Sequence, residues 1–82
     1  MTPAQSRMAR AALDWSLTDL AAHASIGRAS AARFELGHSV APDTLSAIRS
    51  AYEAHGVILI AEGEKSPHGG VGVRLASGGA TQ

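Results

Sequence analysis

The sequence is notable first for what it lacks: its 82 residues include no cysteine, a single Trp, Tyr and Phe, and no net charge. Without cysteine there is neither a disulfide framework nor a Cys-based zinc site, and a reducing cytoplasm is the favoured compartment. No apolar run approaches the length of a membrane span, and no charged-then-apolar leader is present. We therefore expect one small cytoplasmic domain with no membrane partner, burying roughly 60% of its unfolded surface and having a thin margin of stability.

The charges are balanced in total, with seven basic and seven acidic residues, and along the chain they are offset by one charge in each direction. Up to Val40 there are four arginines against three acidic residues, and beyond it three basic residues against four acidic ones. This balance argues against a nucleic-acid-binding protein that works through bulk charge alone. Any such binding should have modest non-specific affinity and a shallow salt dependence.

Capping and stop residues predict four helices. Thr2 and Ser16 are suited to cap the first two, Asp19 completes a capping box with Ser16, and Gly37 and Gly56 stop the last two. Pro3 suits the first helical position because it lacks an N–H there. The predicted helices run from Pro3 to Asp14, from Leu17 to Ala24, from Arg28 or Ala29 to Gly37, and from Pro42 to His55.

Apolar residues at helical spacing predict the inward faces. The expected core positions are Ala4, Met8, Ala11 or Ala12 and Leu13 in the first helix, Leu20, Ala21 and Ala24 in the second, Ala31 and Phe34 in the third, and Leu45, Ile48, Ala51 and Tyr52 in the fourth. The small residues at 21 and 24 predict a close crossing of the second and third helices. We expect Trp15 to pack the junction of the first two helices rather than to stack on a base, because no second aromatic residue lies nearby.

The C-terminal part predicts a β-hairpin. Val57–Ile60 is a continuous apolar run typical of a strand buried on both faces, and the alternation over 71–75 predicts a second strand. The polar, glycine-rich segment 61–70 should be a mobile connection and 77–82 a frayed tail. We divide the chain into a helical unit (1–56), a hairpin (57–76) and a disordered tail (77–82).

Signals for catalysis, metals and cofactors are poor, so we expect no enzyme and no cofactor. The four histidines are scattered, and no two share a helical face beside a carboxylate, so each is expected at the surface without a metal. The Gly-rich pieces at 69–72 and 77–79 lack the residues that follow in a phosphate-binding loop. No serine of the central segment has a paired base and an orienting acid.

The pattern Trp-Ser-x-x-x-Leu-Ala-x-x-Ala-x-Ile over 15–26, followed by Arg-Phe-Glu-x-Gly over 33–37, resembles the Cro/CI repressor (XRE) helix-turn-helix family. The resemblance implies a mostly α, four-helix DNA-binding domain, with the hairpin added at its C-terminus. Family members often pair the residues equivalent to Arg10 and Glu35 between helices. The chain departs from the family at Ser25, where a left-handed turn residue other than Gly costs roughly 1 kcal/mol. It departs also at Ala31, where the family usually has a branched residue, and at Leu17, where the family commonly has a polar residue that contacts phosphate.

The resemblance further implies that the helix from Arg28 to Leu36 lies in the major groove of DNA. The residues expected to read bases are Arg28, Ala29, Ala32 and Arg33, and those expected to touch phosphates are Thr18, Ser30 and His38. Arginine can bridge guanine O6 and N7 while an alanine methyl suits the thymine methyl, so half-sites should contain guanine with thymine close by. In the alternative, Arg33 pairs only with a phosphate.

An isolated two-stranded hairpin is marginal in water and has exposed edges, which predicts a homodimer. One face of Val57–Ile60 could pack on the fourth helix while a second copy covers the other, forming a four-stranded intersubunit sheet across a two-fold axis. The dimerisation residues would be Val57, Ile58, Leu59, Ile60, Val71, Val73 and Leu75. The operator would be an inverted repeat with half-sites about 10 base pairs apart, or a multiple of it. The alternative is a monomer whose hairpin folds back on its own helices.

Two functions follow from the resemblance. The first is a bacterial or phage transcription regulator, such as a repressor, that binds double-stranded DNA in the cytoplasm and is nucleoid-associated. The second is an antitoxin-type interaction protein that binds a toxin and its own promoter. The hairpin and short tail are the only candidates for a toxin-wrapping segment, which favours the regulator.

Overall fold

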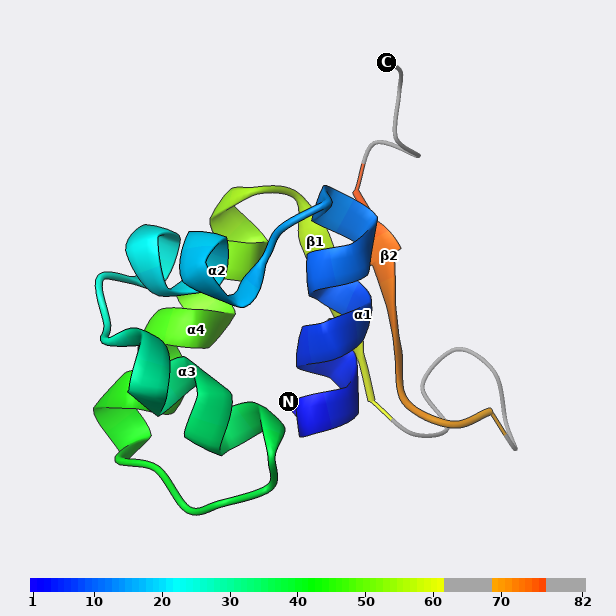
Figure 1. Cartoon of the computed structure of the whole chain (residues 1–82). Coiled ribbons are helices and arrows are strands. Elements are labelled where there is room, and N and C mark those ends of the chain that lie inside the picture. Colours follow the sequence, from blue (N-terminus) through cyan, green and yellow to red (C-terminus); the bar gives the residue numbers. More distant parts are fainter. Residues whose placement is uncertain (62–68, 77–82) are drawn as a thin grey trace.

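The computed structural model describes residues 1–61 and 69–76, which form four helices followed by a two-stranded antiparallel sheet (Figure 1). The elements are α1 (Pro3–Leu13), α2 (Leu17–Ala24), α3 (Arg28–Glu35), α4 (Pro42–Ala54), β1 (Val57–Ile60) and β2 (Gly72–Leu75). The predicted mostly helical class with a C-terminal hairpin is confirmed. Most of the expected mobile connection and the expected tail lie outside the described residues. No helix in the described part of the chain has the length and hydropathy needed to cross a membrane.

Side-chain caps fix where α1 and α2 begin. Thr2 accepts a hydrogen bond from the backbone N–H of Gln5 (3.1 Å), and the Gln5 side chain accepts one from the backbone N–H of Thr2 (2.9 Å). Ser16 and Asp19 form the same reciprocal arrangement at 3.0 and 2.9 Å, as predicted. These boxes satisfy backbone donors that the first turn of a helix otherwise leaves unpaired.

The turn between α2 and α3 has the strained conformation anticipated at Ser25, which has φ 56° and ψ 42°. Its backbone N–H bonds back to carbonyls of α2, so the left-handed residue ends that helix. Asp14 takes the same conformation after α1. The predicted third and fourth helices end slightly earlier than expected, at Glu35 and Ala54, and left-handed glycines follow at 37 and 56.

The helical core is built from small residues around a few large ones. Leu20, Ile48 and Tyr52 are fully buried. The buried set is completed by Ala9, Ala21, Ala24, Ala31, Phe34, Ala51 and Val57. The predicted inward faces of α2 and α3 are confirmed, and in α4 Leu45 is only partly buried.

The predicted inward face of α1 is only partly correct, because Leu13 packs on the core and Ala4 is partly buried but the other predicted positions are exposed. The buried residues of α1 are Gln5, Ser6 and Ala9, whereas Met8 is 38% exposed and Ala11 and Ala12 are exposed. The helix is turned so that polar side chains point inward, because Gln5 meets backbone carbonyls of the hairpin and Ser6 meets polar groups of α3 and α4. Hydrophobic spacing cannot detect a helix whose buried face is held by hydrogen bonds.

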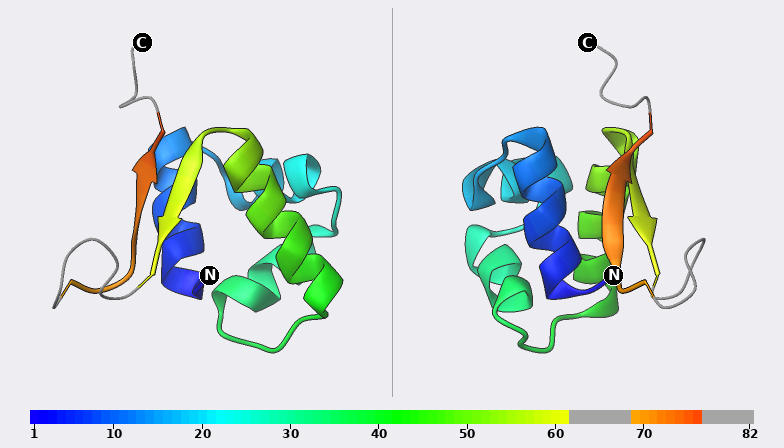
Figure 2. Two further views of the ribbon diagram at one scale, coloured as in Figure 1. Left: turned by 180° about the vertical axis from the view of Figure 1, so that it is seen from behind. Right: turned by 90° about the vertical axis from the view of Figure 1, so that its right-hand side faces the viewer.

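The hairpin folds onto two helices of its own chain, with β1 against α4 and β2 against α1 (Figure 2). Val57 lies opposite Leu75 and Leu59 opposite Val73, and all four pack on the core. Of the β1 residues only Val57 is buried, so the prediction of a strand buried on both faces is wrong for the single chain. The alternation of a strand turns Ile58 and Ile60 to the opposite face. Val71 precedes β2 and is partly buried.

The Gln5 side chain joins α1 to both strands of the hairpin through hydrogen bonds. The Gln5 amide nitrogen donates to the carbonyl oxygens of Ile60 (2.9 Å) and Gly72 (3.0 Å), which face each other on the two strands. In the predicted dimer the hairpin packs on the fourth helix of its own chain, and the structure adds α1 as a second packing partner. Gln5 therefore serves as both a cap residue and a bridge between the strands.

Candidate nucleic-acid interface

The residues of α3 divide into an inward and an outward set. Ala31, Phe34 and Glu35 are buried against the other helices. Arg28, Ala29 and Arg33 are exposed, and Ser30 and Ala32 are partly buried. The outward set contains the four residues expected to read bases, although Ala32 is less accessible than the others.

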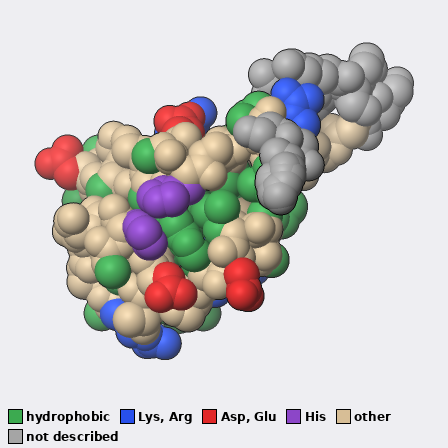
Figure 3. Space-filling model, turned by 90° about the horizontal axis from the view of Figure 1, so that it is seen from above, with side chains coloured by type: hydrophobic (Ala, Val, Ile, Leu, Met, Phe, Trp, Pro, Cys, Tyr) green, Lys and Arg blue, Asp and Glu red, His purple; other side chains and the backbone are tan. Residues whose placement is uncertain are grey.

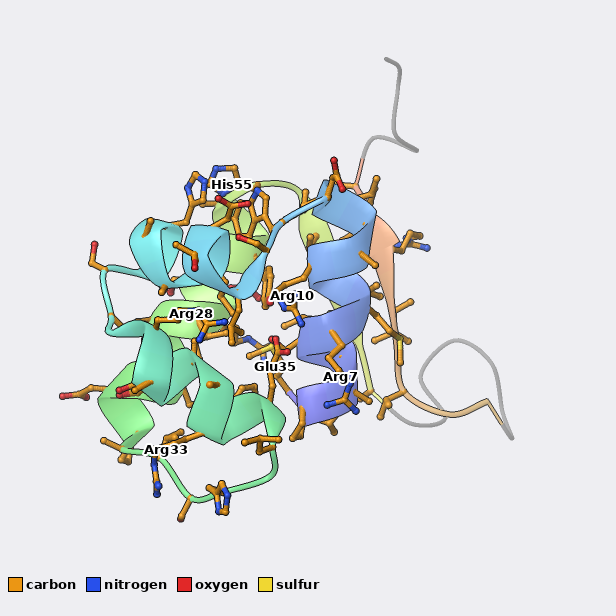
Figure 4. All side chains as sticks on the ribbon, viewed as in Figure 1. Arg7, Arg10, Arg28, Arg33, Glu35 and His55 are labelled. Carbon is orange, nitrogen blue, oxygen red and sulfur yellow. The ribbon has the colours of Figure 1, made fainter. Side chains whose placement is uncertain are left out.

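The two arginines of this outward face have different neighbours (Figure 4). Arg28 Nε donates to the hydroxyl of Thr18 in α2 at 3.2 Å, so these two predicted contact residues lie together. Arg33 Nη2 reaches the carbonyl oxygen of Ser39 at 3.4 Å, in the loop that also carries the exposed His38. Both contacts are weak and exposed, so each guanidinium can exchange them for another acceptor.

Beneath this face, Arg10 and Glu35 form a two-pronged ion pair between α1 and α3. Arg10 Nη2 lies 2.7 Å from Glu35 Oε1, and Arg10 Nε lies 2.9 Å from Glu35 Oε2. The Glu35 side chain is only 7% exposed and that of Arg10 is 23% exposed. Burial alone would raise the pKa of the Glu35 carboxyl, but hydrogen bonds from Arg10 and Ser6 and the guanidinium charge outweigh it and lower that pKa.

Glu35 is also joined to α4 through two hydroxyls. Ser6 Oγ donates to Glu35 Oε2 at 2.6 Å and lies 2.7 Å from the Tyr52 hydroxyl, which donates to the Ser6 carbonyl at 2.9 Å. Burial raises the pKa of Tyr52 to about 12, which keeps the phenol neutral and able to donate. Nothing in the sequence pattern indicated Ser6 or Tyr52 as polar partners, because they belong to distant helices.

Arg7 is a further basic residue that sequence reasoning did not include. Its Nη1 donates to the backbone carbonyl of Glu35 at 2.8 Å, and the side chain is otherwise exposed. The carbonyl belongs to the last residue of α3, where a helix carries partial negative charge and favours a cation. The basic face therefore extends from Arg28 and Arg33 to α1 (Figure 4).

The outward face of α3 and its neighbours is cationic, and its arginines can donate hydrogen bonds to anions or to the acceptor atoms of base edges. Among the described residues no group of three or more His, Cys, Asp or Glu side chains gathers to hold a metal. No protein-family model and no curated protein matches the chain.

Proposed function

We propose that the protein is a sequence-specific DNA-binding regulator of transcription of the Cro/CI type, with α3 as its recognition helix. The observation that carries the proposal is the division of α3, whose inner face is held by the Arg10–Glu35 pair while Arg28, Ala29 and Arg33 face outward. A reading element needs such rigid support, because hydrogen bonds to base edges are lost with small displacements.

In the proposed complex α3 lies in the major groove, which admits an α-helix. Arg28 and Arg33 are the candidates for paired hydrogen bonds to guanine, and Ala29 and Ala32 for contact with a thymine methyl. Thr18, Ser30 and His38 are candidates for phosphate contacts that set the position of the helix. Arg7 joins this second group, because its exposed guanidinium borders the end of α3.

The test is selection of bound oligonucleotides by the intact protein and by Arg33→Ala, with Arg49→Ala as control. Arg49 is an exposed arginine on α4 that pairs with Glu53 and lies outside the α3 face. We expect Arg33→Ala to lose preference at one base pair, by about 1–3 kcal/mol, and Arg49→Ala to keep the full site. If Arg33→Ala weakens binding equally for all DNA sequences, Arg33 contacts only phosphate. A protein that selects no sequence would refute the proposal.

We propose further that the hairpin joins two copies of the chain. Ile58 and Ile60 face away from the helices that cover Val57 and Leu59, and β1 and β2 pair only with each other among the described strands. The hairpin of a second copy could cover these partly exposed isoleucines and pair with the free edge of the two-stranded sheet. Two recognition helices related by the two-fold axis would then meet successive major grooves about 34 Å apart on an inverted repeat.

Light scattering on Ile58→Lys tests the dimer. We expect the intact protein to have twice the mass of the chain and Ile58→Lys to have the mass of one chain, because a charge at the centre of the shared sheet stays unpaired. The control is Ser50→Lys, on the exposed side of α4. Truncation after His55 is less informative, because it removes the buried Val57 from the core. A monomeric intact protein at micromolar concentration would show that the hairpin only folds back on its own helices.

A further inference from the structure

Two histidines that are far apart in the sequence lie in contact at the surface. His23 is in the last turn of α2, and His55 is the residue that ends α4. Their ring centroids are 4.6 Å apart with an angle of 71° between the ring planes, and both residues are exposed. Figure 3 shows two histidine side chains side by side on the upper face, where Figure 4 labels His55.

Trp15 holds both imidazoles in place. Its ring stacks on His23 with centroids 4.2 Å apart and planes within 4° of parallel. It meets His55 edge-on at 4.8 Å, and it also stacks on the buried Tyr52 at 5.8 Å. Trp15 lies between α1 and α2 as predicted, but its ring packs on residues of α2 and of the end of α4. Both histidines are at the surface as predicted, and the structure brings these two together although they are scattered in the sequence.

The separation of the two ring centroids allows both imidazoles to bind one metal ion, and it also lies within the range of about 4.5–7 Å for ordinary edge-to-face ring contacts. A metal–nitrogen bond is about 2.0–2.1 Å, which places the ion about 3.2 Å from a ring centre. For ligand angles between about 90° and 109°, two such rings have centroids about 4.5–5.2 Å apart. The observed 4.6 Å lies inside this range.

The hydrogen bond of His55 determines which of its ring nitrogens can bind an ion. Its Nδ1 lies 2.9 Å from the carbonyl oxygen of Ala51, and a carbonyl can only accept, so Nδ1 carries a proton and Nε2 is the nitrogen left to act as a ligand. A metal-binding histidine commonly has its second nitrogen held in this way. Both histidines also lie at the C-terminal ends of helices, where the partial negative charge favours a cation.

We propose that His23 and His55 bind one divalent first-row transition-metal ion, such as Zn²⁺, Ni²⁺ or Cu²⁺. Imidazole is a preferred ligand of these ions. Since no group of three ligating side chains gathers in the described ranges, the ion keeps its other positions for water or an outside ligand. The site is independent of the proposed DNA-binding function, because His55 lies at the far end of the molecule from Arg33 (Figure 4).

The test is titration of the full chain with Zn²⁺ by calorimetry and with Ni²⁺ by fluorescence. Trp15 is the only tryptophan, so its emission reports directly on an ion bound beside it. We expect one ion per chain and quenching of Trp15 by Ni²⁺. His23→Phe and His55→Phe keep a ring against Trp15 but remove a ligand, and each should lower affinity at least about tenfold, the smallest loss seen for a second-shell change.

The matched control is His38→Gln, because His38 is an exposed histidine outside the proposed site. This variant should bind the ion as the unchanged chain does. Ring-nitrogen NMR of the unchanged protein gives a measurement that needs no variant, and we expect Zn²⁺ to shift the signals of His23 and His55 but not of His38. Absence of binding, binding that survives His23→Phe or His55→Phe unchanged, or shifts confined to other histidines would each overturn the proposal.

Discussion

The third helix and the hairpin both lie against α1, but they are held there by different forces. On one side of α1, Ser6 and Arg10 bind the carboxylate of Glu35 in α3. On the other side, Gln5 binds two strand carbonyls while apolar residues such as Val57 and Leu59 pack on the core. One α-helix therefore uses charge on one face and neutral hydrogen bonds with apolar contact on the other.

The difference indicates how each element responds to change. The inward residues of α3 are one alanine, one phenylalanine and the glutamate, so the polar contacts carry much of its orientation. A buried charge that loses its partner is strongly destabilising, whereas an apolar contact weakens in proportion to the area lost. We therefore expect α3 to be sensitive to single polar substitutions and the hairpin to be more tolerant.

The largest effect is expected when Glu35 is changed to alanine. Its removal leaves the partly buried Arg10 unpaired and Ser6 without its acceptor, and should lower the free energy of unfolding by about 3–5 kcal/mol. Urea denaturation measures this. The control is Glu53→Ala, whose exposed pair with Arg49 should cost less than about 1 kcal/mol. Equal midpoints for the two variants would contradict a special role for the buried pair.

Low pH should weaken the contacts that Glu35 makes between α1 and α3. Because the folded-state pKa of Glu35 lies below that of an unfolded glutamate, its contribution is fully present above the unfolded value of about 4.3. It is lost as the pH falls through the lowered folded value. We expect melting temperatures to fall more steeply below about pH 4.3 for the intact protein than for Glu35→Gln. Parallel curves would show that Glu35 does not contribute to this loss.

A smaller effect is expected on the hairpin side, from Gln5→Glu. Glutamate keeps the reciprocal cap with Thr2, but it replaces the donor that faces the carbonyls of Ile60 and Gly72 by an acceptor. The expected loss is about 1–3 kcal/mol, with faster amide exchange in β1 and β2 than in α3. If exchange rises equally in all elements, the bridge does not act on the hairpin.

The smallest effect is expected at the turn that leads into α3. Ser25→Gly should raise the free energy of unfolding by roughly 1 kcal/mol, because glycine adopts the left-handed conformation without steric cost. Ser50→Gly, inside α4, is the control and should lower it by up to about 1 kcal/mol. Urea midpoints that move in the same direction for both variants would contradict strain at Ser25.

Prediction from the sequence succeeded where the determinants are local. Thr2, Ser16 and Asp19 form the predicted caps, Ser25 takes the left-handed conformation, and helix and strand bounds agree within a few residues. It failed for the buried face of α1, because hydrogen-bonded polar residues have no hydrophobic period. Of the candidate contact residues, Arg7 was missed since its position beside α3 depends on how two helices pack.

The sequence by itself determined the class of fold, the ends of the helices and the division of α3 into two faces, because these depend on residues within one or two turns of each other. Only the tertiary structure decided that Gln5 bridges the strands, that Ser6 and Tyr52 meet at Glu35, and that His23 touches His55. Such pairs join residues separated by 29 to 67 positions, and their distances are set by the packing of whole helices rather than by any local pattern.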